Sequence, residues 1–218
     1  MFRMILYTQW KWSRLAVALG AVAAFALPVL SIGQFGVARA SRWEVQSMLG
    51  SIQAWGVLYP VLALGLGLAV AALAWTYDHR GRHVYALSLP VPRWHYVLLR
   101  FGAGAVLLGG PVIALWAGAL VAAGSATIPA GLHAYPNTLA LRFALAVLVA
   151  YSMLFAASSA TMRTARYFLA AIGVLVAIDV IAAIAGVNIH IFESVFLRIL
   201  VWPGPFDIIT GRWMLIDV

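Results

Sequence analysis

The sequence predicts an all-α, polytopic integral membrane protein, and its composition and the pattern of its apolar runs both lead to this class. Of its 218 residues, 65% are hydrophobic and only 9% are charged, whereas soluble domains average roughly 45–50% apolar and about 25% charged residues. A soluble fold of this size would need more polar surface than the few acids and bases supply. The apolar runs do not alternate with a period of two, so helices and not a barrel are expected to cross the membrane.

Five apolar runs are long enough to cross a membrane, because a spanning helix needs about 20 mostly apolar residues. The predicted spans are residues 15–37, 56–75, 96–123, 139–160 and 167–187. Within them, the glycine pairs Gly65/Gly67 and Gly102/Gly104 indicate close helix packing. We find no internal repeat, so a single transmembrane domain is expected over residues 1–218.

Residues 1–14, MFRMILYTQWKWSR, have the pattern of an amphipathic helix. Arg3, Tyr7, Lys11 and Arg14 fall on one helical face, and apolar residues fall on another. This pattern predicts an interfacial helix that lies along the inner membrane surface and contacts membrane lipids. The alternative is that the segment only extends the first span.

The last segment, residues 188–218, differs from the spans because charges interrupt its apolar runs. Glu193 and Arg198 divide IFESVFLRILVW, and Pro203 and Pro205 break the helix after it. The remainder, FDIITGRWMLIDV, is too short and too charged to cross a membrane. We expect short external helices here, either docked on the outer surface or re-entrant into it.

Basic residues indicate the orientation of the chain. The loop at residues 124–138 contains no Lys, Arg, Asp or Glu, and cytoplasmic loops carry an excess of Lys and Arg. The N-terminus is therefore expected in the cytoplasm and the protein in the cell membrane, as in a bacterial inner membrane. Tryptophans such as Trp75, Trp94 and Trp213 lie near run ends, as expected for aromatic belts at the membrane interfaces. The net charge of +8 comes from these flanks and not from a continuous basic stripe, so nucleic acid is not an expected partner.

Several chemistries are disfavoured by the residues present. The chain has no cysteine, which excludes disulfides, thiolate metal sites and cysteine nucleophiles. Its only lysine is Lys11, which excludes a phosphate-binding loop of the form GxxxxGK[ST]. Ser158 and His190 are predicted at opposite sides of the membrane, roughly 30 Å apart, when catalysis needs about 3 Å. A polar loop explains His79 and His83 as well as a metal does, so we expect no catalytic residue, no metal and no cofactor in this chain.

Asp179 is the one acid inside a predicted span, where a carboxylate costs several kcal/mol unless it is paired or protonated. Two interpretations stay open. Asp179 serves a translocation pathway, or it makes a polar intersubunit contact with a helix such as the one that carries Ser152. In both cases we expect the side chain to face another helix or a dimer axis and not lipid.

The string DHRGRHVYALSLPVPRWHYVLLRFGAGAVLL, which follows the second predicted span, resembles the first cytoplasmic loop of the permease subunits of type-2 ABC exporters. In that family an acid and a glycine precede a short helix of the form LLSLPVSR, and a helix then re-enters the membrane. Arg82 replaces the threonine that usually follows the loop glycine, and the sixth span of the family pattern is not seen. The matching residues are Asp78, Gly81, Leu87, Ser88, Leu89, Pro90, Val91 and Arg93.

This resemblance implies an ATP-driven exporter in which the chain forms the translocation pathway as a homo- or heterodimer of permease subunits. A separate soluble ATP-binding-cassette ATPase is the implied partner, and it would hold the ATP and magnesium. A permease is not itself an enzyme. The loop that couples the ATPase to the membrane helices would comprise Asp78, Arg80, Gly81, Arg82, Tyr85, Leu87, Leu89, Pro90 and Arg93.

The residues of this loop suit a coupling role on physical grounds as well. Pro90 and Pro92 restrict the backbone where the loop meets the third span. Apolar and basic side chains together offer a docking surface for a partner with an acidic cleft. The alternatives are that the bases only fix topology, and that the protein is a non-transporting scaffold subunit of a larger membrane complex.

Overall fold

The structure is a computed structural model, and it describes most of the chain before residue 160 and shorter parts after it. The continuous stretches are residues 1–32, 54–80, 92–125, 132–159, 206–211 and 213–217, and the separate positions are 50, 167, 170, 174, 175, 177–179, 181, 194, 195, 197 and 198. The chain divides into two compact units. The first unit comprises Met1–Phe155 and Arg212–Val218, and the second unit comprises Ala156–Gly211, including the short helix α9 (Asp207–Thr210).

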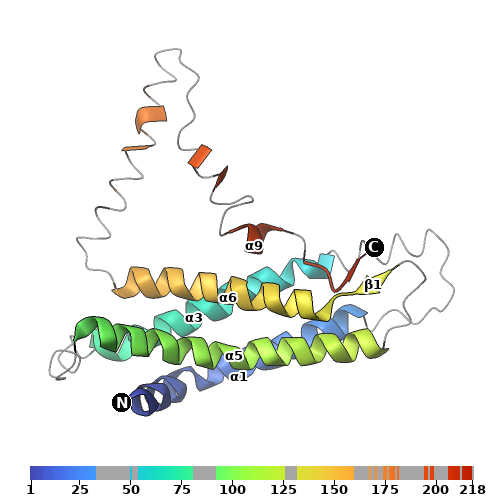
Figure 1. Ribbon diagram of the computed structural model, residues 1–218, viewed down its shortest axis with the longest axis horizontal. Helices are drawn as coiled ribbons and strands as arrows, with labels where there is room; N and C mark the ends of the chain where they lie inside the picture. The colour runs from blue at the N-terminus through green and yellow to red at the C-terminus, as the bar shows by residue number, and fades with distance from the viewer. Residues whose placement is uncertain are drawn as a thin grey trace. The chain divides into compact units, whose positions relative to one another are not determined.

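Within the described residues, four helices are long and apolar enough to cross a membrane. They are α1 (Phe2–Ile32), α3 (Leu58–Arg80), α5 (Arg93–Ser125) and α6 (Pro136–Ser159), seen from the side in Figure 1. They coincide with the first four predicted spans. The fifth predicted span, residues 167–187, lies largely outside the described residues, so the count of five stays a prediction.

The helices extend beyond the apolar runs that predicted them. α3 continues to Arg80, past residue 75, and α5 already begins at Arg93, before residue 96. Helix ends are set by backbone hydrogen bonding and capping and not by apolarity, so a helix can continue through polar residues beyond its apolar run. Pro136 begins α6, where its missing N–H costs nothing because the N–H groups of the first turn have no helical partner.

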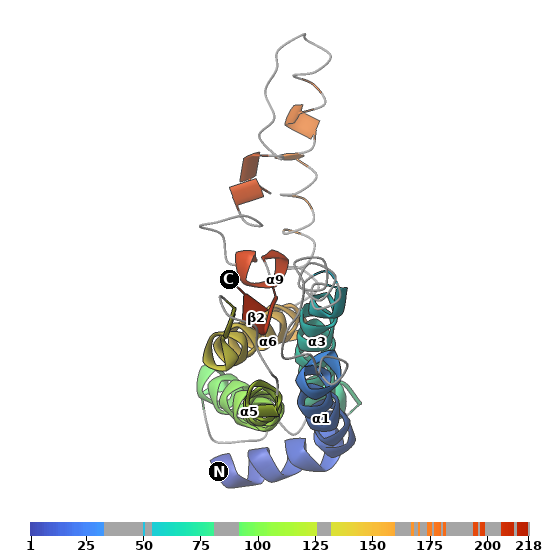
Figure 2. The same ribbon diagram turned by 90° about the vertical axis from the view of Figure 1, so that its right-hand side faces the viewer.

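The long helices of the first unit lie side by side (Figure 1), and the view along them places α3 and α5 at opposite corners, with α1 and α6 between them (Figure 2). α1 packs extensively against α5 and also against α3, whereas α3 and α5 have few direct contacts. Small, fully buried side chains let these backbones approach closely, as is usual in membrane proteins. Examples are Ala24, Ala63, Ala103 and Ala119.

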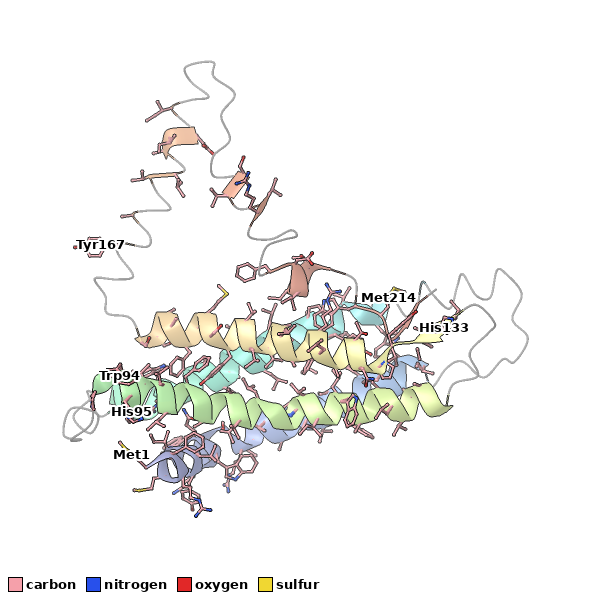
Figure 3. All side chains as sticks on the ribbon, in the orientation of Figure 1. Met1, Trp94, His95, His133, Tyr167 and Met214 are labelled. Atoms are coloured by element: carbon pink, nitrogen blue, oxygen red, sulfur yellow. The ribbon has the colours of Figure 1, made fainter. Side chains whose placement is uncertain are left out.

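The two ends of the first unit differ, and we name them for what they carry. The loop end is where α3 ends and α5 begins, and the tail end is the opposite one. Figure 3 labels Met1, Trp94 and His95 at the loop end, and His133 and Met214 at the tail end.

A short pair of strands lies at the tail end. β1 (His133–Ala134) and β2 (Ile216–Asp217) are antiparallel, with His133 opposite Asp217 and Ala134 opposite Ile216. The main-chain N–H of Tyr135 donates to Leu215 O at 2.8 Å. The pairing attaches the segment after α9 to the segment before α6. The all-α prediction therefore holds for the long elements, and it did not include this short pair of strands.

α1 is one helix where the sequence predicts an interfacial helix followed by a span. No break separates residues 1–14 from the rest, because Lys11 and Arg14 lie on its exposed face and do not interrupt the backbone hydrogen bonds. Figure 2 shows, however, that the first turns of α1 run crosswise to the remainder. Ser13 Oγ donates to Gln9 O at 2.8 Å, and a hydroxyl bonded to the carbonyl four residues earlier often bends a helix.

Apolar side chains cover the outside of these helices. In water such a surface would promote association, whereas in lipid it faces a solvent of its own kind. The apolar surface of these helices thus agrees with their assignment as candidate membrane spans. Exposed apolar residues include Leu15, Leu19, Val22, Val61, Val106, Ile113, Leu141 and Met153.

Candidate functional site

The predicted coupling loop connects α3 to α5 at the loop end. Asp78 and Arg80 lie in the last turns of α3, and Arg93 is the first residue of α5. The other predicted loop residues lie outside the described residues, and they are Gly81, Arg82, Tyr85, Leu87, Leu89 and Pro90. The structure thus describes the two helices that the loop joins, with the side chains of α3 up to residue 75 and those of α5 from residue 94 onward.

Arg100 is the central side chain at the loop end. It lies two turns into α5, and only 5% of the residue is exposed. Its Nε donates to Ala74 O on α3 at 2.8 Å, and one terminal nitrogen donates to the same oxygen. The other terminal nitrogen donates to Tyr96 Oη, one turn earlier on α5. A single guanidinium therefore links α3 to α5 close to the loop.

Aromatic rings enclose this guanidinium. Arg100 Cζ lies 5.1 Å from the ring centroid of Trp75 and 5.5 Å from that of Tyr96. A cation over an aromatic face is stabilised by about 2 kcal/mol or more when water is excluded. Trp75 in turn packs against Phe155 on α6, with 5.1 Å between ring centroids. The charge is thus surrounded by groups that stabilise it out of water.

α6 is attached to α5 through Tyr151. Its hydroxyl donates to Phe101 O at 3.2 Å, and the two rings lie 5.1 Å apart. Phe155, one turn later on α6, meets the edge of Phe101 at 5.4 Å. α6 therefore contacts the residue that directly follows Arg100.

α1 also contacts Arg100. Gln9 of α1 is buried, and its Nε2 donates to Arg100 O at 3.1 Å. Nearby, a ring carbon of Phe2 lies 3.8 Å from where a Cβ on Gly102 would stand. Residue 100 is accordingly bonded to α3 through its side chain and to α1 through its main chain. We call Gln9, Ala74, Trp75, Tyr96 and Arg100 the arginine cluster.

The arrangement of the arginine cluster suits it to holding helices together. Both nitrogens that bond α3 share one main-chain carbonyl oxygen, which cannot rotate away as a side chain does. In the part of the chain that the structure describes, no three His, Cys, Asp or Glu side chains come together as metal ligands would. The described contacts of the arginine cluster therefore serve to connect helices.

Asp179, the predicted pathway or intersubunit residue, lies in the second unit. Its backbone is helical and its side chain is half-buried. The helix suggested as the contact of Asp179 is the one that carries Ser152. Ser152 Oγ donates to Val149 O at 3.0 Å within that helix. Both interpretations of Asp179 stay predictions.

A second cluster of side chains closes the tail end. Trp213 is buried and stacks on Tyr59 of α3, with 6.3 Å between ring centroids and 9° between planes. Arg142 of α6 places its Cζ 5.3 Å from the Trp213 ring centroid. Leu215 and Ile216 are buried beside it. The segment 213–217 is thereby packed onto α3 and α6.

The sequence pattern did not single out Arg100 or Gln9. Arg100 resembles any basic residue that flanks a span and fixes topology. Two signals distinguish it in retrospect: it lies inside the apolar run, and it follows Tyr96 by four residues, on the same helical face. Gln9 is an uncharged polar residue on a helix whose exposed polar residues are mostly basic. The two signals for Arg100 do not identify its hydrogen-bond acceptor on α3.

Comparisons with known proteins assign no family to the chain: no protein-family model matches it, and neither curated proteins nor solved structures gave a match. The class therefore follows from the fold. Over its described residues this is a helical protein with four candidate membrane spans, cross-linked at the loop end by a buried arginine.

Proposed function

We propose that the protein is the membrane-spanning permease subunit of a type-2 ATP-binding-cassette exporter and forms the translocation pathway as a dimer of permease subunits. One observation carries the proposal: the segment that contains LSLPVPR joins two long apolar helices directly. Only residues 81–92 separate α3 from α5. A partner bound to so short a loop would move both helices with little slack.

The proposed energy source is a separate soluble ATPase subunit that holds ATP and Mg²⁺. This chain has a single lysine, Lys11, and hence no phosphate-binding loop of its own. Apolar contact would come from Tyr85, Leu87 and Leu89, and the neighbouring arginines would complement an acidic cleft of the ATPase. The exported substrate would pass between helices of two permease subunits.

In this proposal the N-terminus and the loop end lie in the cytoplasm, and the protein lies in the cell membrane of a bacterium. The crosswise first turns of α1 support an interfacial position for this segment. Residues 1–14 of α1 expose Arg3, Lys11 and Arg14, together with Tyr7 and Trp10. Basic and aromatic side chains of this kind favour the headgroup region of a bilayer.

Orientation can be measured with single cysteines, because the native chain has none and any label is therefore specific. We expect Ser125→Cys to react with a membrane-impermeant thiol reagent applied to right-side-out vesicles. His83→Cys is expected to react only after the vesicles are permeabilised. The opposite pattern, with His83→Cys labelled from outside and Ser125→Cys protected, would reverse the orientation.

Docking is tested by placing a charge in the predicted interface. Purification of the tagged protein from its native membranes is expected to retain a soluble ATPase that carries a phosphate-binding loop. Leu87→Asp buries an unpaired carboxylate at the contact and is expected to weaken retention by about 2–5 kcal/mol. The measurement is the ratio of ATPase to permease after washing.

Ser88→Asp is the matched control, since it adds the same charge to the neighbouring residue, outside the apolar set. It is expected to retain more ATPase than Leu87→Asp, and both variants are expected to insert normally. If Leu87→Asp binds the ATPase and couples its hydrolysis to transport as the native protein does, the loop only anchors topology and the proposal is wrong.

A further inference from the structure

The packing of the first unit leaves a mechanical question at the loop end. α3 and α5 are the two helices that the loop joins, yet they lie at opposite corners and have few direct contacts (Figure 2). A force applied to the loop would tend to spread two such helices apart at this end unless they are also bonded to each other there. The described connection at this end is the side chain of Arg100, which reaches from α5 to Ala74 O on α3.

Arg100 does not behave as a topology anchor. Long basic side chains near helix ends extend along the helix until their charge reaches water. Arg100 instead keeps its guanidinium inside, with 5% of the residue exposed, under the rings of Trp75 and Tyr96. Burial of an arginine carries a desolvation cost that an anchor in the headgroup region avoids, so the burial of Arg100 indicates a role beyond orientation.

The geometry also includes α1. Gln9 donates to the main-chain oxygen of Arg100, and α1 packs against both α3 and α5. The main-chain oxygen of Gln9 in turn accepts a hydrogen bond from Ser13 Oγ on the same helix. Residue 100 is thus a point at the loop end where hydrogen bonds join α5 to both α1 and α3.

We propose that Arg100 is a positioning residue that locks α1, α3 and α5 into one rigid body at the loop end. Displacement of the loop then moves the tail ends of these helices and is not absorbed between α3 and α5. This transmission role rests on the proposed function, since it needs a partner that moves the loop. The lock itself is a property of this chain alone.

The lock is tested first on the isolated protein in lipid nanodiscs. Spin labels on Leu68→Cys and Val106→Cys report the distance between α3 and α5 from lipid-exposed positions beyond the arginine cluster. We expect a narrow distance distribution in the otherwise native chain and a clearly broader one when Arg100→Gln is added. Arg14→Gln, which removes an exposed arginine from α1, is expected to leave the distribution narrow.

A milder variant covers the case in which Arg100→Gln does not fold. Arg100→Lys keeps the positive charge but, with a single nitrogen on a flexible stem, does not reproduce the paired bonds to Ala74 O. It is expected to broaden the distribution in part. An unchanged distribution in Arg100→Gln, or in Arg100→Lys where only that variant folds, overturns the lock.

Transmission is tested with the ATPase bound. Labels on Val61→Cys and Leu120→Cys report the tail ends of α3 and α5, both exposed. In the native background, ATP with vanadate is expected to shift this distance. Arg100→Gln is expected to keep ATPase binding and basal ATP hydrolysis and to lose the nucleotide-dependent shift in distance. A general folding defect would instead reduce all three.

The outcomes distinguish the two proposals. If the native protein binds no ATPase, the proposed function fails and transmission fails with it, while the nanodisc measurement still decides the lock. If Arg100→Gln broadens the α3–α5 distance yet the nucleotide-dependent shift persists, the lock is real and the transmission role is wrong.

Discussion

Trp213→Ala is expected to destabilise the first unit by about 3–5 kcal/mol, the usual cost of replacing a buried tryptophan by alanine. The residue is 5% exposed. Its loss removes the stacked partner of Tyr59 and the ring beneath the Arg142 guanidinium. It also removes the side chain that holds segment 213–217 against α3 and α6. Unfolding in detergent, followed by helix content, measures the change.

Trp94→Ala is the matched control for this prediction. Trp94 lies in the first turn of α5 and is 65% exposed, and substitutions at exposed positions usually change stability by less than about 0.5 kcal/mol. The two variants remove the same atoms from different surroundings. Equal destabilisation in both would show that Trp213 does not carry the tail-end packing.

Gly67→Ala is expected to destabilise the contact between α3 and α6 by about 1–3 kcal/mol, as overpacking of a filled interior does. A Cβ at this position would lie 2.7 Å from Val147 O and 2.8 Å from both Ala150 Cβ and Tyr151 N. These neighbours are main chain or Cβ, so no rotamer change makes room. The two helices must separate to accept the methyl group.

Gly65→Ala on the same helix isolates this effect. Gly65 is exposed, and a Cβ there would have nothing within 4 Å. Alanine is the better helix former of the two residues, so this variant is expected to be neutral or slightly stabilising. A loss of stability in Gly65→Ala equal to that in Gly67→Ala would mean that helix geometry, and not the α3–α6 contact, explains both.

Hydropathy predicted the long helices because length and apolarity are local properties of the sequence. The glycine pair Gly65/Gly67 separately predicted close packing, and the structure assigns that packing to Gly67. Which glycine meets a neighbour depends on the rotation of α3 about its axis. That rotation is set by the other helices and is not visible in one segment.

The tryptophans show the same limit in another form. Trp75, Trp94 and Trp213 all lie near run ends, and an interface belt was expected for each. Trp94 is exposed as a belt residue would be, whereas Trp75 and Trp213 are each 5% exposed and pack in the arginine cluster and at the tail end. Position along the chain fixes the depth of a residue and leaves open whether it points outward or inward.

The arginine cluster was the least predictable part of the structure, because its bonds join residues that are distant in sequence. Gln9 and Arg100 are 91 positions apart, and Arg100 and Ala74 are 26 apart. A guanidinium that donates hydrogen bonds to a main-chain carbonyl has no sequence signature, since every residue has a carbonyl. The pattern marked this region as polar and did not show which base turns inward.

The unequal lengths of the helices have a consequence for the choice of bilayer. α5 has 33 residues and α6 has 24, which correspond to about 50 Å and about 36 Å at 1.5 Å per residue, while the hydrocarbon layer is about 30 Å thick. In a bilayer α5 would therefore tilt or project from the lipid, and α1, which packs against it, would do the same. Bilayers of different thickness would then differ in how much of this pair they cover, and the response would be divided between tilt, projection and local deformation of the lipid.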